Sequence, residues 1–140
     1  MYYDTYKPIL LKVSPDLAHQ QLDEIIDYCL RSGIDGIVAG NTTRSREGLT
    51  TISKEKIEAI GNGGMSGAPV HKKNLELVKY VHTKSAGKLP IIGVGGIMSP
   101  QDAKAMLDAG ASLVEIYSGF IYEGPALIKN IIKHLESNNK

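Results

Sequence analysis

The sequence has a single cysteine, Cys29, among its 140 residues. One cysteine cannot form a disulfide within the chain, and it excludes a metal site built from several cysteines. We therefore expect a reducing compartment. Runs of one charge are also missing, because 16 basic and 15 acidic residues are interspersed and the net charge is +1. This pattern indicates no nucleic-acid partner.

Long apolar runs are absent as well. The longest, such as IIGV at 91–94, are far shorter than a membrane-spanning helix. The first eight residues lack the basic and apolar pattern of a secretion signal. The four histidines have no spacing that suits a metal ion, so we expect no metal site. What remains is a chain of one-domain length with 42% apolar residues, and we treat residues 1–140 as a single unit.

Four short and nearly continuous apolar segments predict strands that are buried on both faces of a parallel sheet. They lie at 9–13, 36–39, 91–94 and 113–117. Amphipathic patterns predict helices after each of them, at 17–33, 74–83, 99–110 and 124–137. Ser99 and Pro100 suit the N-cap and first position of the third helix, and Gly33 suits the end of the first. Strands that alternate with helices predict an α/β fold with parallel strands and right-handed crossovers.

A long segment at 44–70 separates the second strand from the next helix pattern. A structureless connection of this length is uncommon inside a compact domain, so we expect a functional lid or a binding loop. Within it, GNGGMSGAP at 61–69 provides either simple flexibility or a loop that lies flat against a ligand.

Two architectures compete: a small open α/β sandwich and half of a (βα)8 TIM barrel. No GxGxxG motif with a following acidic residue supports a dinucleotide-binding sheet. A complete barrel needs roughly 250 residues, so four consecutive βα units amount to half of one. The glycine-rich turns described next favour the half-barrel.

The last two predicted strands both run into glycine-rich turns, GVGGI at 93–97 and YSGF at 117–120. In TIM barrels a phosphate commonly binds between the loops after strands seven and eight, at the start of a short helix. Close approach of a phosphate to the backbone requires residues without a Cβ, which Gly95, Gly96 and Gly119 provide. The alternative is that these glycines only make tight turns. Their occurrence on consecutive strands favours the phosphate site.

Lys12 lies inside an otherwise apolar strand. A buried ammonium without a partner is costly, so it must reach solvent, a carboxylate or a bound anion. Reaching solvent from the strand tip is the structural alternative. Asn41 and Thr42 follow the second strand, and their amide and hydroxyl groups suit a planar ligand with amide edges. Ordinary turn chemistry explains the same two residues equally well.

Five segments together resemble the C-terminal half of a dihydroorotate dehydrogenase, most closely the class 2, quinone-reducing type. They are PILLKVSPDL, GIDGIVAGNTT, GGMSGAPV, LPIIGVGGIMSPQDA and AGASLVEIYSGFIYEGPALIKNI, and they cover nearly the whole chain from Pro8 onward. The resemblance implies barrel strands five to eight of an FMN-dependent TIM barrel. This family oxidises dihydroorotate to orotate in de novo pyrimidine biosynthesis. For the full-length enzyme it implies peripheral membrane association on the cytoplasmic side, with this part soluble.

The resemblance assigns roles to residues at the strand ends. Lys12 is implied to approach the flavin ring and to stabilise negative charge on the reduced cofactor. Gly40 stands where the family often has a threonine that touches FMN, so it offers a backbone contact only. Asn41 and Thr42 are implied to hydrogen-bond the pyrimidine.

The same resemblance places four residues along the rest of the cofactor. Gly67 and Gly96 are implied as backbone contacts to FMN, and Tyr117 and Ser118 as residues at its phosphate end. This agrees with the phosphate site predicted from the two glycine-rich turns.

The family's catalytic base, a serine in class 2, has no counterpart in these residues, and neither do the first four barrel strands nor the helices thought to receive the quinone. We therefore expect no catalytic residue in this chain, no activity from it alone, and a partner that is either the N-terminal half of the barrel or a second copy. Two alternatives remain: a non-catalytic half-barrel that binds phosphate or flavin, and another FMN or phosphate barrel enzyme, such as a dihydropyrimidine dehydrogenase domain.

Overall fold

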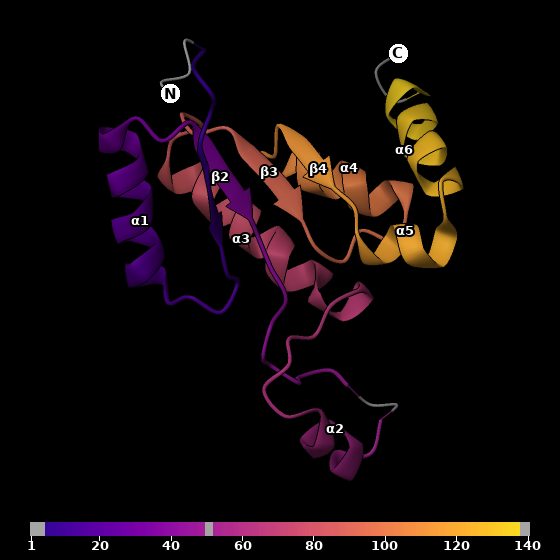
Figure 1. The fold of residues 1–140 in the computed structure, drawn as a ribbon. Coiled ribbons are helices and arrows are strands. Elements are labelled where there is room, and N and C mark those ends of the chain that lie inside the picture. The colour runs from indigo at the N-terminus through magenta and orange to yellow at the C-terminus, as the bar shows by residue number, and fades with distance from the viewer. Residues whose placement is uncertain (1–4, 50–51, 138–140) are drawn as a thin grey trace.

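A computed structural model describes residues 5–49 and 52–137 of the chain. Each strand is followed by at least one helix, as the sequence predicts (Figure 1). The elements in chain order are β1 (Leu10–Val13), α1 (His19–Ser32), β2 (Gly36–Ala39), α2 (Lys54–Ile60), the short 3-10 helix η1 (Ala68–Val70), α3 (His71–Lys84), β3 (Ile91–Val94), α4 (Pro100–Asp108), β4 (Leu113–Glu115), α5 (Ser118–Glu123) and α6 (Ala126–Ser137).

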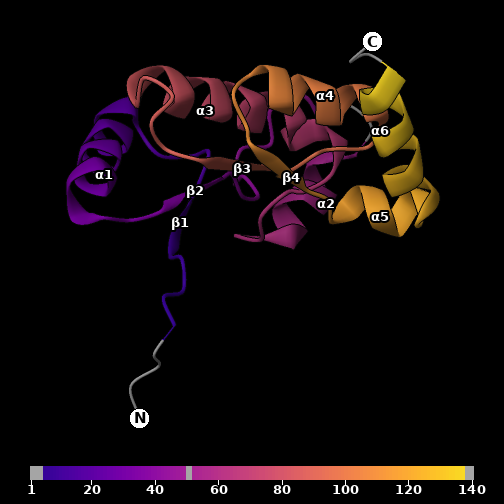
Figure 2. The ribbon, with the colours of Figure 1, turned by 90° about the horizontal axis from the view of Figure 1, so that it is seen from above.

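The four strands form one parallel sheet in the order β1-β2-β3-β4. Sequential order and parallel pairing are both confirmed. Figures 1 and 2 show α3 and α4 on one face of this sheet, with α1 and α6 near its two ends. Consecutive parallel strands with their helices on one side are the arrangement of a (βα)8 barrel wall.

The prediction that the strands are buried on both faces is wrong. Side chains alternate: Ile37, Ala39 and Ile91 are fully buried, whereas Val38 and Ile92 between them are only half-buried. The buried set packs with residues of α1, α3 and α4 in one apolar core. The other set faces the side of the sheet that these helices leave uncovered. We call it the open face, and the side chains on it from β1 to β4 are those of Leu10, Lys12, Val38, Ile92, Val94, Leu113 and Glu115.

Local signals fix several helix ends. Gly33 ends α1 in the left-handed region at φ 76°, as predicted. The Ser99 side chain accepts a hydrogen bond from the Asp102 backbone N–H, and Pro100 opens α4, which confirms the predicted start of that helix. Cys29 is buried in the core on α1, and burial raises the pKa of its thiol.

The long segment after β2 is not structureless. It contains α2, whose N-cap Ser53 accepts a hydrogen bond from the Lys56 N–H, and which Figure 1 shows away from the sheet. Thr43 and Met65 pair as an antiparallel bridge at its base. The Arg46 guanidinium donates to the carbonyls of Gly61 and Gly63, so the segment closes on itself.

The predicted helix at 124–137 is confirmed as α6. The sequence did not predict α5, which precedes it and ends at Gly124, at φ 64°. Among the described residues no helix is both long and apolar enough to span a membrane.

Candidate functional site

A cavity of about 510 Å³ lies at the carboxyl ends of the strands. Its walls come from β1, from the segments that follow β2, β3 and β4, and from the loop before η1. Every predicted site residue except Gly40 and Gly119 lines it, and these are Lys12, Asn41, Thr42, Gly67, Gly95, Gly96, Tyr117 and Ser118. Residues up to 106 positions apart in sequence therefore share one cavity (Lys12 to Ser118, 118 − 12).

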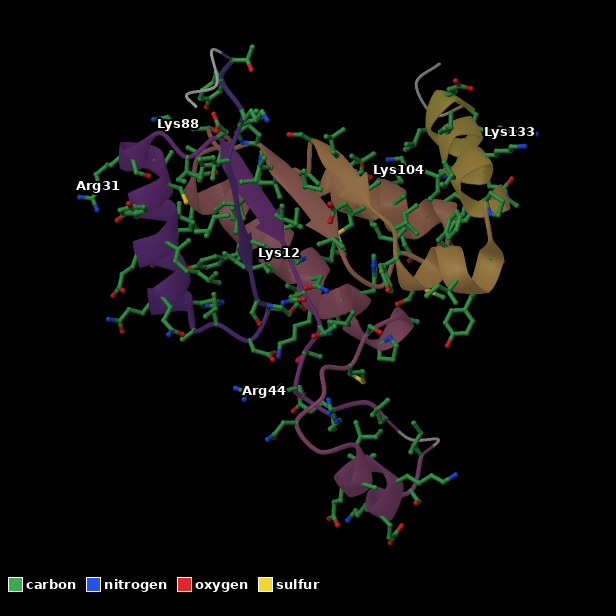
Figure 3. All side chains as sticks on the ribbon, viewed as in Figure 1. Lys12, Arg31, Arg44, Lys88, Lys104 and Lys133 are labelled. Carbon is green, nitrogen blue, oxygen red and sulfur yellow. The ribbon has the colours of Figure 1, made fainter. Side chains whose placement is uncertain are left out.

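Lys12 projects from β1 on the open face of the sheet. Figure 3 shows it over the sheet, whereas Arg31, Lys88 and Lys133 lie toward the periphery of the molecule. Its Nζ donates a hydrogen bond to the Gly40 carbonyl over 2.5 Å. An ammonium has three donors, so two remain for a ligand in the cavity. Lys12 is exposed, so its charge reaches solvent, which is the structural alternative named for it. Its partner within the chain is a backbone carbonyl, and a bound anion stays a prediction.

The segment after β2 presents Asn41 and Thr42 at the cavity, with both residues exposed. Its backbone is held from behind by Asn74 of α3. The Asn74 Oδ1 accepts from the Asn41 N–H at 3.3 Å, and its Nδ2 donates to the Asn41 carbonyl at 3.0 Å. Sequence reasoning missed Asn74, although a signal existed. Asn74 begins the buried stripe that continues through Leu77, Val78 and Val81, at spacings i+3, i+4 and i+7.

The next residues are fixed by Asp16, which follows β1. Its carboxylate accepts hydrogen bonds from the Thr43 hydroxyl at 2.5 Å and from the Arg44 N–H at 2.8 Å. It also pairs with the Lys73 ammonium at 2.6 Å. Desolvation of this carboxylate opposes ionisation, but the hydrogen bonds from Lys73, Thr43 and Arg44 outweigh it and lower the pKa of Asp16 to about 2. Sequence reasoning missed this cluster too.

The Asp16 cluster makes stability depend on acid pH. Because the pKa of Asp16 is lower in the folded chain than its ordinary 3.8, its contribution is complete above about pH 4 and is lost as the pH falls toward 2. We expect Asp16→Asn to lower the free energy of unfolding at pH 7 and to flatten its fall between about pH 4 and 2. Urea unfolding across this range tests it, with Asp27→Asn on α1 as the control. An unchanged acid slope in Asp16→Asn would contradict the assignment.

The glycines of the two turns are required by the protein's own packing. Gly95 and Gly96 have φ of +112° and +74°, in the left-handed region. A Cβ on Gly96 would lie 2.6 Å from backbone atoms of His71 at the start of α3. A Cβ on Gly119 would lie 2.1 Å from the carbonyl oxygen of Ile97. The sequence predicts glycine here because a phosphate would approach the backbone closely. Packing within the fold is a second reason for glycine, because a Cβ would clash with the protein itself.

Gly40 and Gly119 are buried behind the cavity wall. Their roles as cofactor contacts stay predictions. At the neighbouring turn, Ser118 begins α5 and Tyr117 is 78% exposed. The first N–H groups of a helix have no acceptor within it, so that of Ser118, which lines the cavity, is available to an anion.

Acidic, histidine and cysteine side chains do not gather into a metal site. Across residues 5–49 and 52–137, no group of three or more of them could hold a metal ion. The polar groups that line the cavity are instead one ammonium, the Glu115 carboxylate, amide and hydroxyl groups, and backbone N–H groups.

Comparisons with known proteins give the family. The sequence model of the family described as dihydroorotate dehydrogenase matches residues 3–138. A dihydroorotate dehydrogenase (quinone) from Christiangramia forsetii is 51% identical over 125 residues, which cover 89% of this chain and 35% of that protein. One from Salinispora arenicola is 46% identical over 123 residues, which cover 88% of this chain and 36% of that protein.

The fold comparison agrees. A crystal structure of ligand-free DHODH from Eimeria tenella superposes with a TM-score of 0.81 at 33% identity, covering 90% of this chain and 34% of that one. The match confirms the predicted half of a TIM barrel, and the chain spans about a third of the length of these relatives. The chain belongs to the dihydroorotate dehydrogenase family.

Proposed function

We propose that these residues form the FMN- and orotate-binding part of a dihydroorotate dehydrogenase, which oxidises dihydroorotate to orotate in de novo pyrimidine biosynthesis. Family membership supports a flavin cofactor. The observation that carries the proposal is the single cavity that gathers Lys12, the Asn41–Thr42 pair and both glycine-rich turns.

The donor groups of the cavity fit FMN and a pyrimidine. Lys12 supplies a positive charge on the open face, where it would lie beside the flavin ring. Asn41 and Thr42 would pair with the amide edges of the pyrimidine. Gly95, Gly96, Tyr117 and Ser118 would hold the phosphate end, where the start of α5 favours negative charge. FMN, when bound, supplies the acceptor for the hydride that dihydroorotate loses.

The relatives indicate further partners for the full-length enzyme. Their printed name includes a quinone, which we propose as the electron acceptor. We further propose peripheral association with the cytoplasmic side of a membrane, where a quinone is found. The open face would be covered by the N-terminal half of the barrel or by a second copy of this chain. In each case the partner would bury apolar side chains such as Val38 and Ile92.

The 140 residues alone should not oxidise dihydroorotate. Removing a proton from carbon needs a base within hydrogen-bond reach of that proton, and the family's serine base has no counterpart here. With added FMN and a dye as electron acceptor, we expect no turnover above the protein-free rate. A complete relative assayed alongside provides the positive control. Turnover by this chain would show that a catalytic base lies within these residues, contrary to the proposal that they only bind the cofactor and the substrate.

Lys12 should discriminate between the oxidation states of the flavin. Lys12→Met keeps an unbranched apolar stem and removes the charge. We expect the affinity for reduced FMN, which carries more negative charge, to fall about tenfold further than that for oxidised FMN, a difference of about 1.4 kcal/mol. Anaerobic titrations of both forms measure this, with Lys88→Met, at the periphery in Figure 3, as the control. Equal losses of affinity for the two forms of FMN would show that Lys12 does not lie beside the flavin ring.

A non-catalytic half-barrel that binds flavin or phosphate is the second candidate function. The predicted phosphate site between the two glycine-rich turns supports it. This candidate function predicts that flavin binds but that orotate does not bind at Asn41 and Thr42. An orotate titration therefore separates the two proposals.

A further inference from the structure

Asn74 is the one fully buried amide side chain in the described residues, with 0% of its surface exposed. It lies in the first turn of α3, behind the cavity, and does not line it. Both of its polar atoms are used, and both bond to the backbone of a single residue, Asn41. A side-chain amide thus pairs with a backbone N–H and C=O that face the same way.

Two glycines pack against the same amide from different turns. A Cβ on Gly40 would lie 1.9 Å from the Asn74 Oδ1, and a Cβ on Gly95 would lie 2.1 Å from its Nδ2. Gly40 follows β2 and Gly95 follows β3. One side chain therefore sets the distance between the turn that carries Asn41 and the turn that carries the predicted phosphate contacts.

Only an amide satisfies this arrangement. The Asn41 backbone presents one donor and one acceptor, and a terminal carboxamide answers both with its oxygen and its NH₂ group. An ionised carboxylate offers acceptors alone, and an aliphatic side chain of similar size offers neither. Because Asn74 is fully buried, a polar group without a hydrogen-bond partner at this position would have no solvent water to replace that partner.

We propose that Asn74 is a positioning residue that fixes the Gly40–Asn41 backbone against the Gly95 turn, so that the pyrimidine and the flavin are held at a set spacing. The identity of the two ligands rests on the proposed function, whereas the positioning of Asn41 does not. Asn74 contacts neither ligand. Because Asn74 holds Asn41, which would contact the pyrimidine, its loss should weaken pyrimidine binding more than flavin binding.

The test compares three variants of the isotopically labelled chain. Asn74→Ala removes both hydrogen bonds. Asn74→Asp keeps the shape and an acceptor for the Asn41 N–H, but it loses the donor to the Asn41 carbonyl. Val81→Ala, about two turns further along α3 at another fully buried position, controls for a general loss of packing. For each, hydrogen exchange of the Asn41 amide is measured without ligand, followed by the affinities for FMN and orotate.

We expect at least tenfold faster exchange of the Asn41 amide in Asn74→Ala, with protection partly kept in Asn74→Asp and fully kept in Val81→Ala. Orotate affinity should fall at least tenfold in both Asn74 variants, and by more than FMN affinity. If Asn74→Ala does not fold, the isosteric Asn74→Asp decides the question through its orotate affinity. Unchanged Asn41 exchange in Asn74→Ala, or an orotate loss no larger than in Val81→Ala, overturns the proposal. If the unsubstituted chain binds no orotate, the proposed function fails, and the exchange of Asn41 alone decides the role of Asn74.

Discussion

Replacing Gly96 with alanine should destabilise the chain strongly and abolish flavin binding. Gly96 has φ +74°, where an alanine costs about 1 kcal/mol, and the clash with His71 adds about 1–3 kcal/mol. The atoms that the new Cβ would meet, at 2.6 Å, include the backbone N and Cα of His71. They cannot yield without moving the start of α3, and with it the cavity wall. We expect FMN affinity to fall by at least a hundredfold.

Gly33→Ala provides the matched control. Gly33 has φ +76°, nearly the same backbone conformation, but no described atom lies within 4 Å of the position its Cβ would take. It should cost only the conformational strain, about 1 kcal/mol, and leave FMN affinity unchanged. Urea unfolding and flavin titration measure both quantities. Equal losses of stability in the two variants would show that glycine is needed at Gly96 only for its backbone conformation. Normal flavin binding by Gly96→Ala would show that this turn does not contact the flavin.

A lysine at Leu113 should shift the chain from an associated state toward the monomer. Within residues 5–49 and 52–137, the two edges of the sheet, β1 and β4, have no further strand beside them, and no layer covers the apolar side chains of its open face. Such edges and faces are templates for association. Leu113, on β4, is 62% exposed. We expect the unsubstituted chain to dimerise at micromolar concentration, and Leu113→Lys to weaken this association about tenfold or more, since burying an unpaired charge is costly.

Tyr28→Lys is the control, because Tyr28 is 60% exposed on α1, away from the open face. It should leave the association unchanged. Sedimentation across a concentration series measures the effect. A monomeric unsubstituted chain that binds no apolar dye would mean that the open face is covered from within, contrary to the fold described above.

The sheet was predictable because short apolar segments and helical stripes determine it locally. The bounds of β2 and β3 match the prediction, and the strands are adjacent in the sheet in their order along the chain, as expected for successive βα units. The helix α2 was missed because it buries no residue and so shows no apolar stripe. Burial on one face only was missed because the apolar pattern of a strand indicates which side chains seek burial, without indicating whether a covering layer is present.

The cavity was predictable for a topological reason, since the carboxyl ends of parallel strands meet at one edge of the sheet. The residues that hold its wall were not. Asn74 meets Asn41 across 33 residues, and Asp16 meets Lys73 across 57. The buried stripe of α3 marks Asn74 as a residue that faces the core, but nothing in the local sequence identifies its partner. The role of Asp16 arises only from the tertiary contact.

Whether these residues bind FMN is measured by the visible spectrum of the purified chain after mixing with FMN and removal of unbound flavin by gel filtration. We expect flavin absorbance that coelutes with the protein near one equivalent per chain, is retained in Gly33→Ala and is lost in Gly96→Ala. A folded chain that elutes without flavin absorbance would contradict this expectation.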